Sequence, residues 1–73
     1  MRTITKDITP YYAKITVTFD EEGILPITDI YPTIPAFRQN AMTQVPAMFA
    51  ACKIDPPTAE EMNMIQTWIN ETN

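Results

Sequence analysis

The sequence predicts an α+β fold, in which a small two- to three-stranded antiparallel sheet from the N-terminal half is covered on one face by two to three C-terminal helices. Two observations lead to this prediction. Residues 2–31 contain segments in which apolar and polar residues alternate, as they do in strands with one buried face. Residues 33–70 contain apolar residues at helical spacing together with helix-capping patterns. The 73 residues are enough for one domain, residues 1–73, and no more.

The clearest strand pattern covers residues 11–20. Its apolar side chains fall on one side: Tyr11, Ala13, Ile15, Val17 and Phe19. Its polar side chains fall on the other: Lys14, Thr16, Thr18 and Asp20, with Tyr12 among them. β-Branched and aromatic residues dominate, which suits a pleated surface. We therefore expect a central strand with one buried face and one face in water.

Two further strands are expected on either side of this one. Residues 2–8 alternate briefly before Thr9-Pro10 interrupts them, because proline donates no ladder hydrogen bond. Gly23, the single glycine of the chain, is expected to supply the positive φ of a hairpin loop. Residues 24–31 then form the second arm, which Pro26 and Pro32 reduce to an edge strand or an extended segment.

A first helix is expected to begin at Thr33, with Pro35 in its first turn, where a missing N–H costs nothing. Its apolar stripe is Ile34, Phe37, Ala41, Met42 and Val45. Pro46 disfavours helical geometry at Val45, so we expect a kink or break there. A fresh helix capped by Thr43 would then run to about Lys53, with Val45, Met48, Phe49 and Cys52 as its apolar stripe.

The last helix has the clearest signals. Thr58 and Glu61 have the spacing of a capping box, and the helix is expected to run from Ala59 to about Asn70. Glu60 and Glu61 also complement the positive end of the helix dipole. Its shared apolar face is Met62, Ile65, Trp68 and Ile69.

The sequence offers little support for catalysis, and we expect no enzyme, no cofactor and no metal site. It contains no histidine to act as a general base, and a single glycine cannot make a phosphate-binding loop. Cys52 lies on an apolar stripe, which favours a small buried hydrophobe over a nucleophile. The acids Asp20, Glu21 and Glu22 lack the ligand spacing of a calcium site.

Charge and hydropathy narrow the classes of partner. The net charge is −4, and residues 21–73 alone carry a net charge of −5, so no basic surface for nucleic acid is expected. No apolar run approaches the roughly 20 residues that span a membrane. The N-terminal residues 1–7 also lack the apolar core of a signal peptide. We expect a cytoplasmic protein that binds neither nucleic acid nor membranes.

Three surface features are candidates for binding another protein. The first is an acidic rim formed by Asp20, Glu21, Glu22, Asp55, Glu60 and Glu61, which would suit a basic partner or serve solubility alone. The second is the aromatic set of Tyr12, on the wet face of the central strand, Tyr31 and Trp68. The third is the group of methionines, which would make either a plastic core or an adaptable binding face.

These features favour binding without catalysis. The leading interpretation is a small acidic protein-binding module, an accessory or inhibitor protein similar in kind to phage modulators of host proteins that handle nucleic acid. This similarity is one of class and rests on no motif. The alternative is a small structural subunit or assembly factor of a larger complex.

A homodimer is also expected. The helices contain more apolar residues than one small sheet would bury: Phe37, Met42, Val45, Met48, Phe49, Met62, Ile65, Trp68 and Ile69. This small chain has a single cysteine and so no internal disulfide to stabilise it. A second copy would cover the surplus apolar surface of the helices. The interface would then consist of helical residues together with Tyr12.

Overall fold

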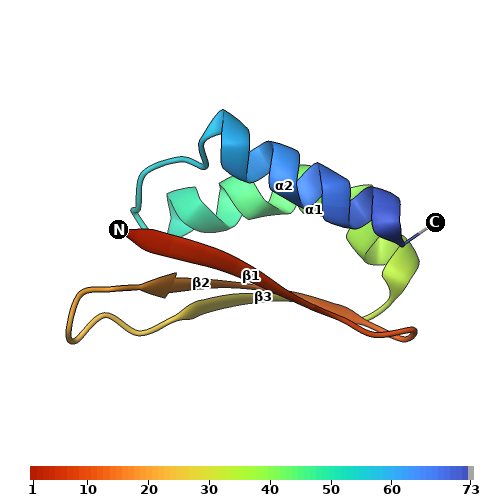
Figure 1. Ribbon diagram of the computed structural model, residues 1–73, viewed down its shortest axis with the longest axis horizontal. Coiled ribbons are helices and arrows are strands. Elements are labelled where there is room, and N and C mark those ends of the chain that lie inside the picture. The colour runs from red at the N-terminus through yellow and green to blue at the C-terminus, as the bar shows by residue number, and fades with distance from the viewer. Residues whose placement is uncertain (73) are drawn as a thin grey trace.

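The structure is a computed structural model that describes residues 1–72. Three strands, β1 (Arg2–Ile8), β2 (Ala13–Phe19) and β3 (Ile27–Tyr31), precede two helices, α1 (Ile34–Ala51) and α2 (Ala59–Glu71). The strands form one antiparallel sheet in the order β1-β2-β3. Figure 1 shows both helices on the same side of this sheet. The predicted α+β class, with an N-terminal antiparallel sheet followed by C-terminal helices, is confirmed.

The register of the sheet separates its two faces. Ile4 pairs with Val17 and Lys6 pairs with Ile15, so alternate residues of β1 and β2 share the face that contributes to the core. The opposite face is polar and rich in threonine: Thr3, Thr5, Thr16, Thr18 and Thr28. The alternation of apolar and polar residues in the sequence therefore corresponds to the buried and polar faces of the folded sheet.

The core combines strand and helix side chains. The strands contribute Ile4, Ala13, Ile15, Val17 and Tyr31, and the helices contribute Phe37, Ala41, Val45, Phe49, Ile65 and Ile69. Tyr31 buries its ring edge-on to Phe37, with ring centroids 5.3 Å apart, while its hydroxyl donates to Asp29 Oδ2 at 2.7 Å. Burial and this hydrogen bond raise the pKa of Tyr31 above its ordinary value. The hydroxyl group of Tyr31, although its ring is buried in the core, thus keeps a hydrogen-bond partner.

The central strand is shorter than predicted at its beginning. β2 starts at Ala13, and Tyr11, which we placed on the buried side, is 80% exposed. The reason is a tight turn in which Thr9 N–H donates to Tyr12 O at 2.9 Å, while the N–H groups of Tyr11 and Tyr12 donate to Thr9 Oγ1. Pro10 sits at the second position of this turn, where its fixed φ is favourable. The turn therefore takes Tyr11 out of the strand.

The expected break at Pro46 does not occur. α1 continues from Ile34 to Ala51 with Pro46 inside it, so no new helix begins at Thr43. Its buried residues recur at every fourth position, namely Phe37, Ala41, Val45 and Phe49, and none is exposed. A proline inside a helix costs about 3 kcal/mol, which burial of this unbroken stripe exceeds. Tertiary packing therefore overrides the tendency of Pro46 to break the helix. The predicted cap at Thr33 is confirmed, because Ala36 N–H donates to Thr33 Oγ1.

The end of α1 corrects the position of Cys52. The helix stops at Ala51, and Cys52 is its exposed C-cap instead of a buried member of the apolar stripe. Lys53 adopts the left-handed conformation at φ 57°, Lys53 N–H donates to Ala50 O, and Ile54 N–H donates to Phe49 O. These two bonds form a Schellman motif, with lysine where glycine is usual. The motif ends the helix at the point where Cys52 would otherwise have extended the buried stripe.

α2 begins as the sequence predicts. Glu61 N–H donates to Thr58 Oγ1 at 3.1 Å, and Thr58 N–H donates to Glu61 Oε1 at 2.8 Å. Both halves of the capping box are therefore present. Ile65 and Ile69 are buried on its core-facing side, with Met62, Met64 and Trp68 packed around them.

The helices leave little of their apolar surface exposed. Of the nine helical residues expected to be in surplus, four are fully buried, and only Met42, at 37%, is among the exposed large hydrophobic residues. The exposed ones otherwise lie at the N-terminus, in the hairpin connections and on β3: Met1, Tyr11, Ile24, Leu25 and Ile30. The expected surplus of exposed apolar residues on the helices is therefore wrong, while the homodimer itself stays a prediction.

Candidate protein-binding site

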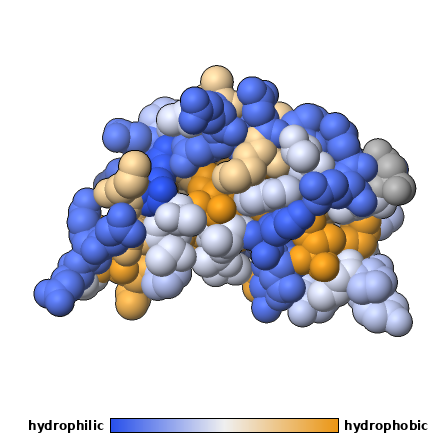
Figure 2. All heavy atoms as spheres, viewed as in Figure 1, coloured by the Kyte–Doolittle hydropathy of each residue, from blue (hydrophilic) through white to orange (hydrophobic). Residues whose placement is uncertain are grey.

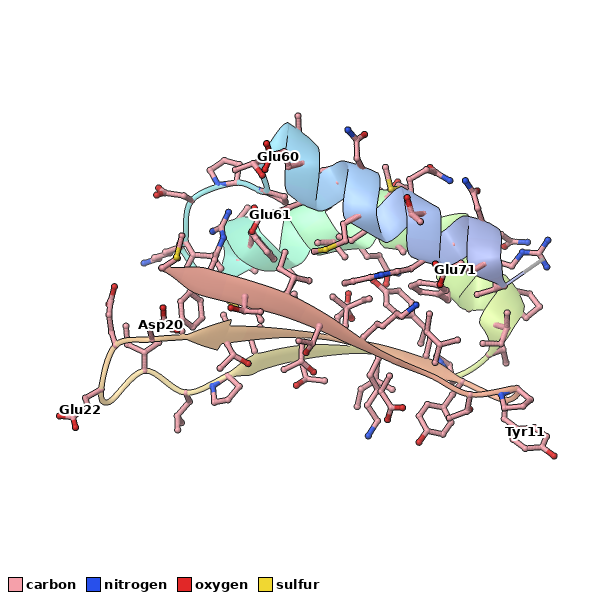
Figure 3. All side chains as sticks on the ribbon, viewed as in Figure 1. Tyr11, Asp20, Glu22, Glu60, Glu61 and Glu71 are labelled. Atoms are coloured by element: carbon pink, nitrogen blue, oxygen red, sulfur yellow. The ribbon has the colours of Figure 1, made fainter. Side chains whose placement is uncertain are left out.

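Most of the predicted acidic rim gathers at one end of the molecule. Figure 3 shows Asp20 and Glu22 in the β2–β3 connection and Glu60 and Glu61 at the start of α2, all toward the end where the N-terminus lies. Asp20 N–H donates to Met1 O at 3.1 Å, which joins the end of β2 to the N-terminus, and the neighbouring Arg2 pairs with Glu61 at the start of α2. Segments that are far apart in the sequence thus meet at this end.

Glu61 must be removed from the rim as a docking group. Arg2 Nη2 lies 2.7 Å from Glu61 Oε1 and Arg2 Nε lies 3.0 Å from Oε2, and only 16% of each side chain is exposed. The hydrogen bond from Arg2 lowers the pKa of Glu61, against the effect of burial, and the same bond raises the pKa of Arg2. This carboxylate therefore stabilises the fold through its pairing with Arg2 and is not counted as a docking group.

The remaining rim carboxylates are exposed, and we call them the acidic end: Asp20, Glu21, Glu22, Asp55 and Glu60. The ion pairs found among residues 1–72 are Arg2–Glu61 and Lys6–Glu71, and neither uses a member of this set. A surface of this kind attracts cations and repels phosphate.

A pocket of about 640 Å³ opens at the acidic end, between the hairpin connection and the segment that joins α1 to α2. Its apolar lining comes from Met1, Phe19, Ile24, Ile27 and Ile54. Glu21 and Asp55 contribute carboxylates to the same lining. Cys52 and Lys53 line it as well. Two members of the acidic end therefore line an apolar depression, which the sequence alone did not predict.

Exposed apolar residues of the hairpin connection lie beside this pocket. Leu25 is 81% exposed and Ile24 is 44% exposed, directly after the acids and Gly23 at φ 83°. Figure 2 shows hydrophobic atoms in separate places on a mostly polar face, one of them at this end of the molecule. The sequence analysis placed both residues in the expected arm 24–31, but β3 begins only at Ile27 and leaves them exposed in the connection.

The two aromatic residues predicted to bind a partner do not join the acidic end. Tyr12 lies at the opposite hairpin, next to the labelled Tyr11 of Figure 3, and Lys14 Nζ is 5.5 Å from its ring centroid. Trp68 is partly buried on α2, where Lys6 Nζ lies 5.6 Å from its ring centroid. The structure thus divides the predicted partner-binding residues among three places and brings only the acids together.

The described residues offer no arrangement for metal chemistry. Among residues 1–72, no group of three or more His, Cys, Asp and Glu side chains is placed to hold a metal ion. Within the same residues, neither helix is both long and apolar enough to cross a membrane.

No family model, curated protein or solved structure matches the chain.

Proposed function

We propose that this protein is a non-enzymatic binding module whose acidic end docks on a basic surface of another protein. The observation that supports the proposal is a set of five exposed carboxylates, two of which, Glu21 and Asp55, line an apolar pocket. Carboxylates steer a basic partner into contact, and the apolar surface supplies burial once contact is made. Neither feature needs a catalytic group.

Within this class, we propose a modulator or inhibitor, of the phage type, that acts on a protein handling nucleic acid. A cluster of exposed carboxylates competes with phosphate groups for the same lysines and arginines. A cytoplasmic location suits such a target. The acidic module itself is expected to leave duplex DNA unbound at physiological salt.

The first test identifies a partner by co-purification from the native host and then measures its binding kinetics. Replacing Asp20, Glu21 and Glu22 with serine is expected to slow association more than it speeds dissociation, since exposed charges act mainly on encounter. Added salt should have the same effect. Kinetics that respond to neither change would refute the proposal, and a set of structural proteins in the purification would favour a subunit or assembly factor instead.

A matched pair of single substitutions locates the effect. Glu21→Gln removes one charge from the acidic end, whereas Asp7→Asn removes one exposed charge from β1, away from the pocket. Only Glu21→Gln is expected to slow association. Equal slowing by both variants would assign the effect to net charge alone and contradict docking through the acidic end.

Self-association is tested separately, because a homodimer remains part of the proposal. Sedimentation equilibrium distinguishes a monomer of 8.3 kDa from a dimer of twice that mass. A monomer at all concentrations would leave the apolar residues of the acidic end free for a different partner. A dimer that dissociates on Ile24→Ser would place the second copy at this pocket.

A further inference from the structure

The pocket at the acidic end has two opposed walls that come from distant parts of the chain. Glu21 and Ile24 belong to the hairpin connection, while Ile54 and Asp55 belong to the segment between α1 and α2. Each wall therefore contains a carboxylate and an apolar side chain, and the second wall also contains Lys53. Ile27 on β3 adds further apolar lining.

The volume and lining suit an apolar side chain from outside. Ligand pockets commonly measure about 300–1,000 Å³ and are lined by apolar groups with a few polar ones. Here Ile24 keeps 44% of its surface exposed, although the neighbouring Ile27 and Ile54 are partly buried. A bulky side chain placed between the walls would remove this remaining apolar surface from water.

The charges around the pocket favour cations beside that side chain. Arg2 also lines the pocket, but its guanidinium already donates to Glu61, to Asp55 O at 2.8 Å and to Pro56 O at 2.9 Å. It is therefore engaged within the fold and is a poor receptor for an anion. Lys53 is an exposed cation of the same lining, but it stands against two exposed carboxylates there, Glu21 and Asp55. The other exposed acids of the acidic end add to the negative charge on this side of the molecule.

We propose that this pocket takes one bulky apolar side chain of a lysine- and arginine-rich protein segment, with the flanking cations on the carboxylates of the two walls. The inference rests on the proposed function and names its recognition element. It makes the partner's apolar residue the centre of the interface and the surrounding charges its rim.

The test uses short synthetic peptides that share lysine- and arginine-rich flanks and differ at one central residue. The peptide with a central phenylalanine is expected to bind at least about tenfold more tightly than the peptide with a central alanine, as burial of one aromatic side chain implies. Its binding should shift the NMR methyl signals of Ile24, Ile27 and Ile54 and should slow alkylation of Cys52, which lines the pocket. A third peptide keeps the phenylalanine between glutamate flanks and is expected to bind more weakly than either basic peptide.

A matched pair of isoleucine variants tests the location. Ile24→Ser alters the pocket, while Ile30→Ser alters another exposed isoleucine, on β3, that does not line it. Only Ile24→Ser is expected to remove the preference for phenylalanine over alanine. A denaturation curve of each variant shows that it is folded. Loss of the preference in both variants, or in neither, would overturn the assignment to this pocket.

The outcomes separate this inference from the proposed function. Equal, salt-sensitive binding of the phenylalanine and alanine peptides would overturn the pocket inference and leave docking on a basic surface intact. Binding of the glutamate-flanked peptide as tightly as the basic one would overturn the requirement for cations. Absence of binding by every basic peptide would count against both.

Discussion

Arg2 and Glu61 lie 59 positions apart in the chain and are joined by two hydrogen bonds between a guanidinium and a carboxylate. Arg2 also donates to the carbonyl oxygens of Asp55 and Pro56, and its Cζ lies 4.8 Å from the ring centroid of Phe49. Glu61 accepts from Thr58 N–H at the same time. One side chain of β1 therefore holds the segment between the helices and the first turn of α2, and with them one wall of the pocket.

Arg2→Met is expected to destabilise the fold by about 2 kcal/mol, because it leaves a largely buried carboxylate without its charged partner. Arg2→Lys should recover only part of this loss, since an ammonium cannot form the paired geometry of a guanidinium. Urea denaturation gives the free energies of unfolding. Full recovery by lysine would show that charge alone matters at this position.

Lys6→Met provides the comparison on the same strand. Lys6 Nζ lies 2.6 Å from Glu71 Oε2, but 36% and 54% of the two side chains are exposed. Exposed ion pairs contribute less than about 1 kcal/mol, so this substitution should lower the free energy of unfolding much less than Arg2→Met. Equal losses in the two variants would contradict the central role of Arg2.

The Arg2–Glu61 pair predicts a stability that falls in acid. The pKa of Glu61 is lowered in the folded protein from its ordinary value of 4.5, so its contribution is present above that value. The contribution is lost as the pH falls through the lowered pKa. Urea midpoints measured from neutral pH into acid should therefore fall more steeply for the natural protein than for Glu61→Gln. Parallel curves would show that Glu61 has no shifted pKa.

Lys53→Gly is expected to stabilise the protein by about 1 kcal/mol. Lys53 occupies the left-handed conformation at the end of α1, where a side chain is strained and glycine is not. Lys53→Ala is the control, because it removes the charge and keeps the strain, so its unfolding free energy should change little. A gain from alanine equal to that from glycine would assign the effect to charge.

Thr58→Ala is expected to destabilise the protein by about 1 kcal/mol, since Glu61 N–H loses the hydroxyl that caps the helix. Thr18→Ala serves as a control on the exposed face of the sheet, where no helix terminus is involved. Thermal unfolding of both variants provides the measurement. An unchanged midpoint for Thr58→Ala would mean that the capping box contributes nothing to stability.

Local patterns were sufficient for much of the fold. Alternation placed the strands, Gly23 placed a loop, and Thr58 with Glu61 placed the start of α2. These signals work because each depends on neighbours within a few residues. The acids of the candidate site were also found in this way, although the sequence did not reveal that Glu61 pairs with Arg2.

The sequence by itself therefore determined the class of the fold, its element order and the acidic character of one end. Only the tertiary structure decided that α1 passes through Pro46, that Cys52 is exposed and that the hairpin connection and the segment after α1 form one pocket. The physical reason is sequence distance. A continuous buried stripe outweighs a local proline penalty, and a pocket between residues 19–27 and 52–58 exists only after the chain has brought those segments together.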